Sequence, residues 1–179
     1  MSLRDSAKLF WDLGRTAHDP QLWRQALTQG LVQLFEARLA VRVERKVSPE
    51  GSLSTSCPPH LFGEALPQAR ALHDNSVQRV AREGDYLSNP FYLSEALPEQ
   101  EPLGFSGFSR MGEVRYRQCT FVRTLLRPLA CCDGLLLALR HAKTQLEFHL
   151  FRPEGAPPFS PAEIRAGQEL MSGLGELLP

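Results

Sequence analysis

The chain has 179 residues, of which 42% are hydrophobic, and this is enough apolar material for one globular domain with a buried core. Lysine plus arginine and aspartate plus glutamate number 20 each, so the net charge favours neither nucleic acid nor an anionic membrane. Apolar runs are too short to span a bilayer, and the N-terminus lacks a signal-peptide core. We therefore expect one cytoplasmic domain over residues 1–179, without membrane segments and without direct binding of nucleic acid.

Two helices are predicted at the N-terminus. Apolar residues recur near helical spacing over residues 2–16, and a second apolar stripe continues to about residue 36. Asp19 and Pro20 form a helix-start pair, because an N-cap acceptor precedes a proline whose missing N–H costs nothing at the first helical position. The second helix is therefore predicted to begin at this pair.

A hairpin and a third helix are predicted next. Residues 38–46 alternate with a period of two, which indicates a strand with one apolar face and one wet face. A turn at 49–51 lets residues 52–57 return antiparallel, and a Pro-Pro pair ends the hairpin. An apolar stripe then predicts a helix over residues 63–83, closed by a glycine.

Residues 85–112 have no strong periodicity. Prolines and glycines interrupt the segment, and its aromatic residues are Tyr86, Phe91, Tyr92, Phe105 and Phe108. A segment of this length without periodicity is usually a functional lid, or it contains a short strand with a weak pattern. We predict that it covers a ligand. The alternative is that its aromatic side chains only fasten a long loop to the core.

The last third of the chain has the clearest pattern. An amphipathic helix with arginines on its exposed side ends at Pro128. Residues 135–139 are apolar on both faces, as in a central strand, and the half-buried strand 146–151 is predicted to pair with them as a hairpin. Ser160 and Glu163 form a capping box that opens a helix over about 161–178. This helix and the one over 2–16 are predicted to form a homodimer interface.

The order of these elements is similar to the GAF/PAS-type sensor architecture, an α+β fold with an antiparallel sheet of five or six strands and helices packed on it. The C-terminal third resembles, more specifically, the GAF-like sensor region of LuxR-type transcriptional regulators. The stretches that carry this resemblance are Arg123–Leu129, Asp133–Leu139, Leu150–Pro153 and Pro158–Glu163. The resemblance implies a non-enzymatic sensory or regulatory domain of a bacterial signalling protein.

The chain departs from that family in two ways. Such regulators carry a helix-turn-helix after the sensor region, whereas this sequence stops at Pro179, so the resemblance does not extend to DNA binding. In the branch that senses acyl-homoserine lactones, tryptophan, tyrosine and aspartate in the middle of the domain hold the ligand. Here the tryptophans are Trp11 and Trp23, so that ligand is not transferred.

Signs of catalysis are weak. Residues 104–108 superficially suggest a G-x-S-x-G nucleophile elbow, but Phe108 stands where the motif needs glycine. Cys119 could be a sensor thiol or a nucleophile, although a buried cysteine is more often a small hydrophobic residue. We therefore expect no enzymatic activity.

Metal binding also has only a weak signal. Cys131 and Cys132, with His141 and His149, supply suitable atoms without a recognised spacing, and free thiols are the more frequent outcome. No metal or cofactor is expected.

The residues expected to contact a ligand are Tyr92, Phe105, Phe108, Arg110, Tyr116 and Cys119. The aromatic side chains would supply apolar contacts and Arg110 a polar anchor, for a small molecule or a protein partner. One alternative is an interaction or scaffold protein whose pocket is filled by its own side chains, and a more distant one is an enzyme that uses Cys119. A filled interior favours the scaffold, and an aromatic cavity with convergent polar groups favours sensing.

Overall fold

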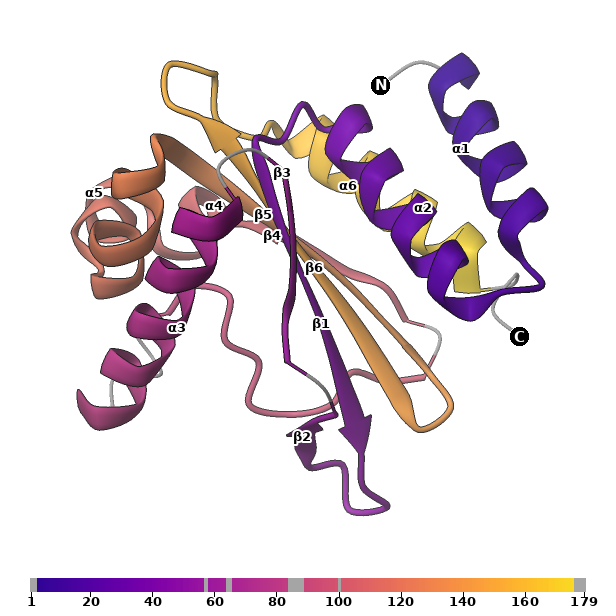
Figure 1. Ribbon diagram of the computed structural model, residues 1–179, viewed down its shortest axis with the longest axis horizontal. Helices are drawn as coiled ribbons and strands as arrows, with labels where there is room; N and C mark the ends of the chain where they lie inside the picture. Colours follow the sequence, from indigo (N-terminus) through magenta and orange to yellow (C-terminus); the bar gives the residue numbers. More distant parts are fainter. Residues whose placement is uncertain (1–2, 57, 64–65, 84–88, 100, 176–179) are drawn as a thin grey trace.

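A six-stranded antiparallel sheet forms the centre of the computed structural model, which describes residues 3–56, 58–63, 66–83, 89–99 and 101–175 (Figure 1). The strands follow the order β2-β1-β6-β5-β4, and β3 also pairs with β1. Helices pack on the sheet, so the predicted α+β class with five or six antiparallel strands is confirmed. The strands are β1 Leu39–Val47, β2 Leu53–Thr55, β3 His60–Gly63, β4 Leu103–Ser106, β5 Cys131–His141 and β6 Thr144–Pro153.

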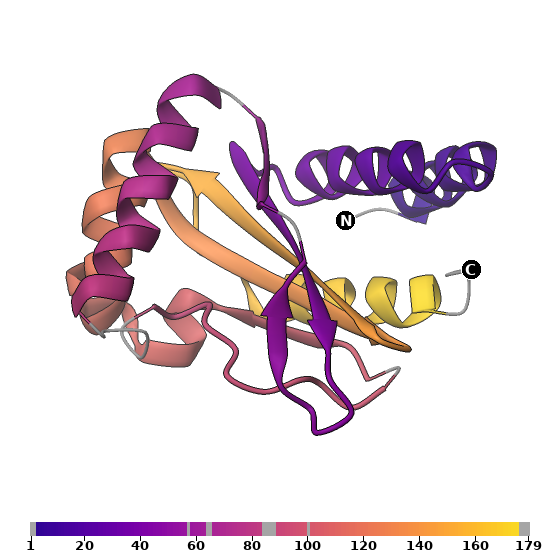
Figure 2. The ribbon, with the colours of Figure 1, turned by 60° about the horizontal axis from the view of Figure 1, so that its bottom comes forward.

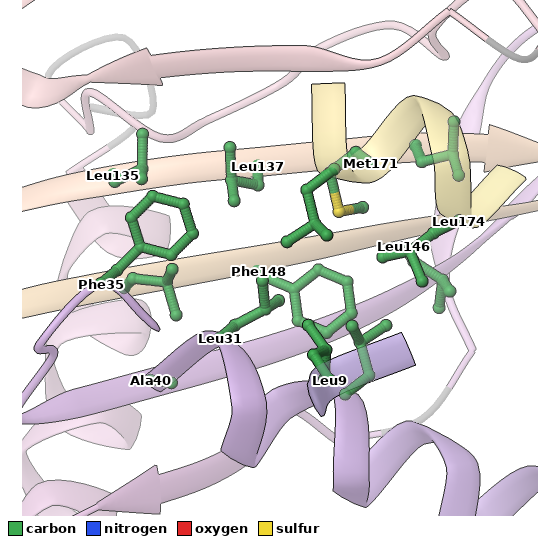
Figure 3. Packing of buried hydrophobic residues seen from close by; sticks show 14 of the residues in the cluster. Leu9, Leu31, Phe35, Ala40, Leu135, Leu137, Leu146, Phe148, Met171 and Leu174 are labelled. Atoms are coloured by element: carbon green, nitrogen blue, oxygen red, sulfur yellow. The ribbon is translucent and has the colours of Figure 1, made fainter. Parts of the chain in front are cut away.

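Three helices cover one face of the sheet, namely α1 Leu3–Thr16, α2 Pro20–Leu34 and α6 Pro161–Gly175 (Figures 1 and 2). Leu31 of α2, Phe35 just beyond it and Met171 of α6 pack against Leu137 of β5 and Phe148 of β6 (Figure 3). These side chains are at most 1% exposed, so the apolar stripes predicted for the helices do face the sheet.

Other helices and helical turns cover the opposite face. They are α3 Leu66–Glu83, α4 Gly107–Met111, α5 Glu113–Gln118, a π-helical turn at Val122–Leu126 and a 3-10 turn at Arg127–Leu129. None of the helices within the described ranges has both the length and the apolar character that crossing a bilayer requires.

Residues 89–99 also lie on this second face, and we call them the strap. The Leu97 N–H donates to Gln145 Oε1 at 2.8 Å, and Arg140 Nη1 donates to the Leu97 carbonyl at 3.2 Å. Near the β1–β2 turn, the Ala96 N–H donates to the Gly51 carbonyl at 3.2 Å. These bonds tie the strap to three different strands or turns, while its apolar side chains pack into the second core.

The helix-start signals in the sequence are confirmed. Asp19 Oδ1 accepts hydrogen bonds from the N–H groups of Gln21 and Leu22 at the start of α2. At the start of α6, Ser160 Oγ accepts from the Glu163 N–H and Glu163 Oε2 accepts from the Ser160 N–H, which completes the capping box.

Several predicted boundaries are wrong. Residues 60–63 form β3, so the helix predicted over 63–83 begins at Leu66. The segment 85–112 contains the strand β4, which confirms the expectation of a short strand there, and also the helix α4; its residues 85–88 and 100 lie outside the described ranges. The amphipathic helix before Pro128 is interrupted at Cys119, whose extended backbone (φ −66°, ψ 149°) separates α5 from the turns that follow.

The faces predicted to be wet in two strands are buried. In β1, Ala40 is 0% and Arg42 is 6% exposed; in β6, Glu147 is 0% and His149 is 8% exposed. The alternation itself is right, but the sheet is covered on both sides. The polar positions of β6 therefore face the strap and the second core instead of solvent.

Candidate functional site

Aromatic rings from several elements meet beneath the strap, with Phe91 at the centre. Its side chain is 0% exposed, and its ring centroid lies 5.5 to 6.5 Å from those of five other rings. Those five rings belong to Phe105 of β4, Tyr116 of α5, Phe121, and His149 and Phe151 of β6. We call these rings, together with Phe108 of α4, the aromatic cluster.

Hydrogen bonds at Phe91 and the preceding residue hold the Phe91 ring against the sheet. Asn89 Oδ1 accepts from the Phe91 N–H at 3.0 Å, which is an Asx turn. Arg110 Nη1 donates to the Pro90 carbonyl at 2.8 Å, and the Arg110 guanidinium carbon lies 4.6 Å from the centroid of the Phe105 ring. Arg110 therefore joins α4 to both the strap and the aromatic cluster.

Gly134 makes room for the Phe91 ring against β5. A Cβ atom at Gly134 would lie 2.5 Å from Phe91 Cζ and 2.8 Å from the ring of Phe151. Any side chain at this position would displace one of the two rings. The ring of Phe91 thus packs directly on the backbone of the strand.

Tyr116 brings a polar atom into this apolar layer. Its ring packs edge-on to Phe108, with centroids 5.1 Å apart, and edge-on to Phe91 at 6.2 Å. The residue is 0% exposed, and among the described residues its hydroxyl has no hydrogen-bond partner. Burial, followed by the charge of Asp133, raises the pKa of Tyr116 well above its ordinary value, so the hydroxyl remains protonated at neutral pH.

A row of polar side chains on β6 borders the aromatic cluster. Gln145 Nε2 donates to Glu147 Oε1 at 2.8 Å, Arg45 Nε lies 2.8 Å from the same oxygen, and His149 Nε2 lies 3.5 Å from Glu147 Oε2. Burial raises the pKa of Glu147, but His149, Arg45 and Gln145 together lower it below its ordinary value. The row therefore contains a buried, ionised carboxylate whose oxygens are already engaged.

Asp133 connects the cluster to the start of α6. Its Oδ1 accepts from the N–H groups of Gly134 at 2.9 Å and Phe108 at 3.4 Å, and its Oδ2 accepts from the Phe159 N–H at 3.0 Å. Burial raises the pKa of Asp133, while these three donors act in the opposite direction. One buried carboxyl group thus holds α4 and the residue before the α6 cap together.

The structure brings four of the six predicted ligand contacts together. Phe105, Phe108 and Tyr116 belong to the aromatic cluster, and Arg110 lies over Phe105. The other two differ: Tyr92 lies half-buried in the strap, and buried Cys119 caps α5 through bonds from its N–H to the Arg115 and Tyr116 carbonyls.

The sequence pattern did not indicate the central role of Phe91 or the polar row of Gln145, Glu147 and His149. One feature of the sequence could have predicted that this polar row is buried. Because residues 135–139 are apolar on both faces, their sheet must be covered on both sides, and a paired strand would then bury its charged residues as well.

The weaker chemical candidates have structural roles. The Ser106 hydroxyl, 1% exposed, accepts from the Ser109 N–H at 3.1 Å and caps α4, so it is already engaged. Cys119 and Cys131 are buried in the second core, and the Cys132 thiol donates to the Pro153 carbonyl at 3.2 Å. Within the described part of the chain, no three His, Cys, Asp or Glu side chains are grouped as metal ligands.

A groove of about 720 Å³ lies elsewhere, between α1 and α2, on the other side of the sheet. Charged residues such as Lys8, Asp12 and Arg15 line it, together with a few apolar ones. None of the six predicted ligand contacts lines this groove.

Comparison with known proteins identifies the fold. No family model and no curated protein matches the sequence. The LBD domain of VqsR from Pseudomonas aeruginosa aligns with 96% of this chain and 93% of its own, with a TM-score of 0.57 and 16% identity. SdiA from Escherichia coli aligns with 97% of this chain and 65% of its own, with a TM-score of 0.54 and 14% identity. The chain thus has the fold of the ligand-binding domains of LuxR-family regulators over nearly its whole length.

Proposed function

We propose that this chain is a non-enzymatic sensory domain of a cytoplasmic bacterial signalling or transcription-regulation protein, and that it binds a small molecule beneath the strap. The fold supports a sensory role, since the VqsR domain of similar fold is a ligand-binding domain (LBD). The proposed contacts are those predicted from the sequence, Tyr92, Phe105, Phe108, Arg110, Tyr116 and Cys119, with Phe91 added.

The single observation that carries this proposal is the buried hydroxyl of Tyr116. A buried polar group without a partner costs roughly 1–3 kcal/mol, and phenylalanine would fill the same space without that cost. A domain that needed only a packed interior gains nothing from this hydroxyl. A domain that binds a ligand gains a specific hydrogen bond in a site from which water is excluded.

The second candidate function is an interaction or scaffold protein with a permanently filled interior. One observation favours it, namely the 0% exposed Phe91 ring at the centre of the site. The two functions differ in what the strap does. In a scaffold the strap stays in place, whereas in a sensor it has to move when a ligand binds.

The test is native mass spectrometry of the protein purified from a bacterial cytosol, followed by denaturation to release any bound small molecule. We expect a released compound from the wild type and a reduced yield from Tyr116→Phe. Phe108→Leu, which reshapes the apolar wall and keeps the Tyr116 hydroxyl, is the variant matched to Tyr116→Phe. An apo mass in every preparation, with no thermal stabilisation by any member of a metabolite library, would support the scaffold instead.

The location of the site is tested separately from its existence. A compound that is retained equally by Tyr116→Phe and Phe108→Leu, but lost from Asp12→Lys, would place the ligand in the groove between α1 and α2. That result would contradict the proposed site while leaving the sensory function standing.

We also propose that the domain forms a homodimer through its terminal helices. Trp11 of the terminal helix α1 is 70% exposed, and contact with a second copy would bury this apolar side chain. Light scattering at micromolar concentration is expected to give the mass of a dimer for the wild type and of a monomer for Trp11→Glu. A monomeric wild type would contradict the proposal.

A further inference from the structure

We infer that the Phe91 ring occupies the position of a ligand's aromatic ring, and that the site accepts a flat aromatic ring carrying a neutral hydrogen-bond acceptor. Phe91 leaves this position when such a ligand binds. The inference rests on the proposed sensory function and specifies the chemical class that the same site recognises.

The geometry around Phe91 is that of a slot for one planar ring. Phe105 lies parallel to it, with 5° between the ring planes, while Tyr116, Phe121 and Phe151 present their rings at 66° to 85°. Gly134 leaves the remaining side open down to the backbone of β5. Parallel and edge-on neighbours around a glycine select a flat ring over a branched aliphatic group of similar size.

Phe91 is the member of this cluster that can leave without unfolding the sheet. The strap that carries it is neither helix nor strand, and its described ties are individual hydrogen bonds, such as those at Asn89, Pro90 and Leu97. The other cluster residues lie in or beside regular elements. Segments held by few hydrogen bonds open at lower free energy than paired strands. Breaking the contact between Arg110 and the Pro90 carbonyl would release the residue next to Phe91.

The requirement for an acceptor comes from the Tyr116 hydroxyl. Phe91 has no polar side-chain atom, so while its ring occupies the slot the hydroxyl stays without a partner. A protonated hydroxyl can donate to a carbonyl or ether oxygen on an incoming ring. The buried Asp133 contributes negative potential at Tyr116, which disfavours an anionic ligand and favours a neutral acceptor.

The test uses Phe91→Ala in the full chain and two probes of similar size, acetophenone and ethylbenzene, of which only acetophenone carries an acceptor. By isothermal titration calorimetry, we expect Phe91→Ala to bind acetophenone at least tenfold more tightly than the wild type, because no internal ring has to be displaced. Phe148→Ala is the matched control, since it removes an equally buried ring from the other core. Equal binding by both variants, or no binding by Phe91→Ala, would overturn the inference.

The acceptor requirement is read from a double-variant comparison. In the Phe91→Ala background, Tyr116→Phe is expected to reduce the acetophenone-to-ethylbenzene affinity ratio roughly tenfold, as expected for the loss of one buried hydrogen bond. The ratio cancels the difference in hydrophobicity between the probes. An unchanged ratio would refute the role of Tyr116.

A second measurement uses the wild-type sequence, in case Phe91→Ala does not fold. Protein labelled with 4-fluorophenylalanine gives a fluorine NMR signal for Phe91, assigned by its absence in Phe91→Leu. Millimolar acetophenone is expected to shift this signal towards the position of exposed phenylalanine, and an unmoved signal would overturn the inference. A natural ligand that leaves the signal unmoved would overturn it too, while supporting the proposed function. Ring binding without any natural ligand would support the slot and count against sensing.

Discussion

Replacing Tyr116 by phenylalanine is expected to stabilise the ligand-free protein. The substitution removes one oxygen atom from a fully buried position where no group in the described ranges forms a hydrogen bond with it. Relief of the desolvation penalty is worth roughly 1–3 kcal/mol, and part of it is lost to the small void that the oxygen leaves. The expected net gain in the free energy of unfolding is therefore about 1 kcal/mol.

Urea unfolding at pH 7 measures this gain as a higher midpoint with an unchanged slope. Ser106→Ala is the matched control, because its buried hydroxyl accepts a hydrogen bond from the Ser109 N–H and caps α4. Losing that cap is expected to cost about 1 kcal/mol, so the two hydroxyl deletions should have opposite signs.

The stability difference between Tyr116→Phe and the wild type should also depend on pH in the alkaline range. In the unfolded chain the hydroxyl ionises near its ordinary pKa of 10.0, whereas in the folded protein the pKa lies well above that value. The folded state therefore keeps a proton that the unfolded state loses, and the wild type loses stability as the pH rises above 10.0. Tyr116→Phe lacks this loss, so its advantage should grow by up to about 1.4 kcal/mol per pH unit. A destabilised Tyr116→Phe at pH 7, with an unchanged slope, would show that the hydroxyl has a partner in solution and would refute the reasoning.

Three further predictions concern buried polar groups. Arg45→Met removes the guanidinium beside the buried Glu147 carboxylate and should lower the unfolding free energy by about 3 kcal/mol in urea. The matched control Arg117→Met, at an exposed pair, should cost less than about 0.5 kcal/mol. Because the pKa of Glu147 is lowered, the stability that its ionised form contributes is present above pH 4.5 and is lost as the pH falls. Arg45→Met should therefore lose less stability in acid than the wild type. An equal loss of stability in both proteins would count against the pair. Asp133→Ala leaves three N–H groups without an acceptor and should cost about 3 kcal/mol by the same assay, with Asp133→Asn losing less. Wild type and Cys119→Ser should both lack catalytic activity, and any activity that disappears with the substitution would contradict a non-enzymatic role.

The parts of the fold that follow from local chemistry were predictable. The caps at Asp19 and Ser160 depend on residues within one turn of each helix start, and the structure confirms both. The apolar stretch 135–139 lies in the central region of the sheet for the same reason, because a strand without polar positions has to be covered on both faces.

What could not be predicted depends on contacts between distant residues. Alternation in β6 shows that Glu147 and Phe148 point to opposite faces, but not that the strap covers the polar one. Phe91 is one aromatic residue among several in an irregular segment, and its central place arises because Gly134, far along the chain, leaves a space for its ring. The interruption at Cys119 has no local signal such as proline or glycine, so the sequence pattern predicts an unbroken helix there.

The polar row also determines how β6 can be built into the sheet. In the native register Leu39 of β1 faces Phe151, and Lys46 faces Thr144. A slip by one residue would turn the carboxylate of Glu147 towards the layer of Leu31 and Met171, away from Arg45, and burying a charge without its partners costs several kcal/mol. An all-apolar strand would tolerate such a shift far more easily. The polar row therefore disfavours a shifted register of β6. Substitutions that make this face more hydrophobic should yield chains in which β6 pairs in more than one register.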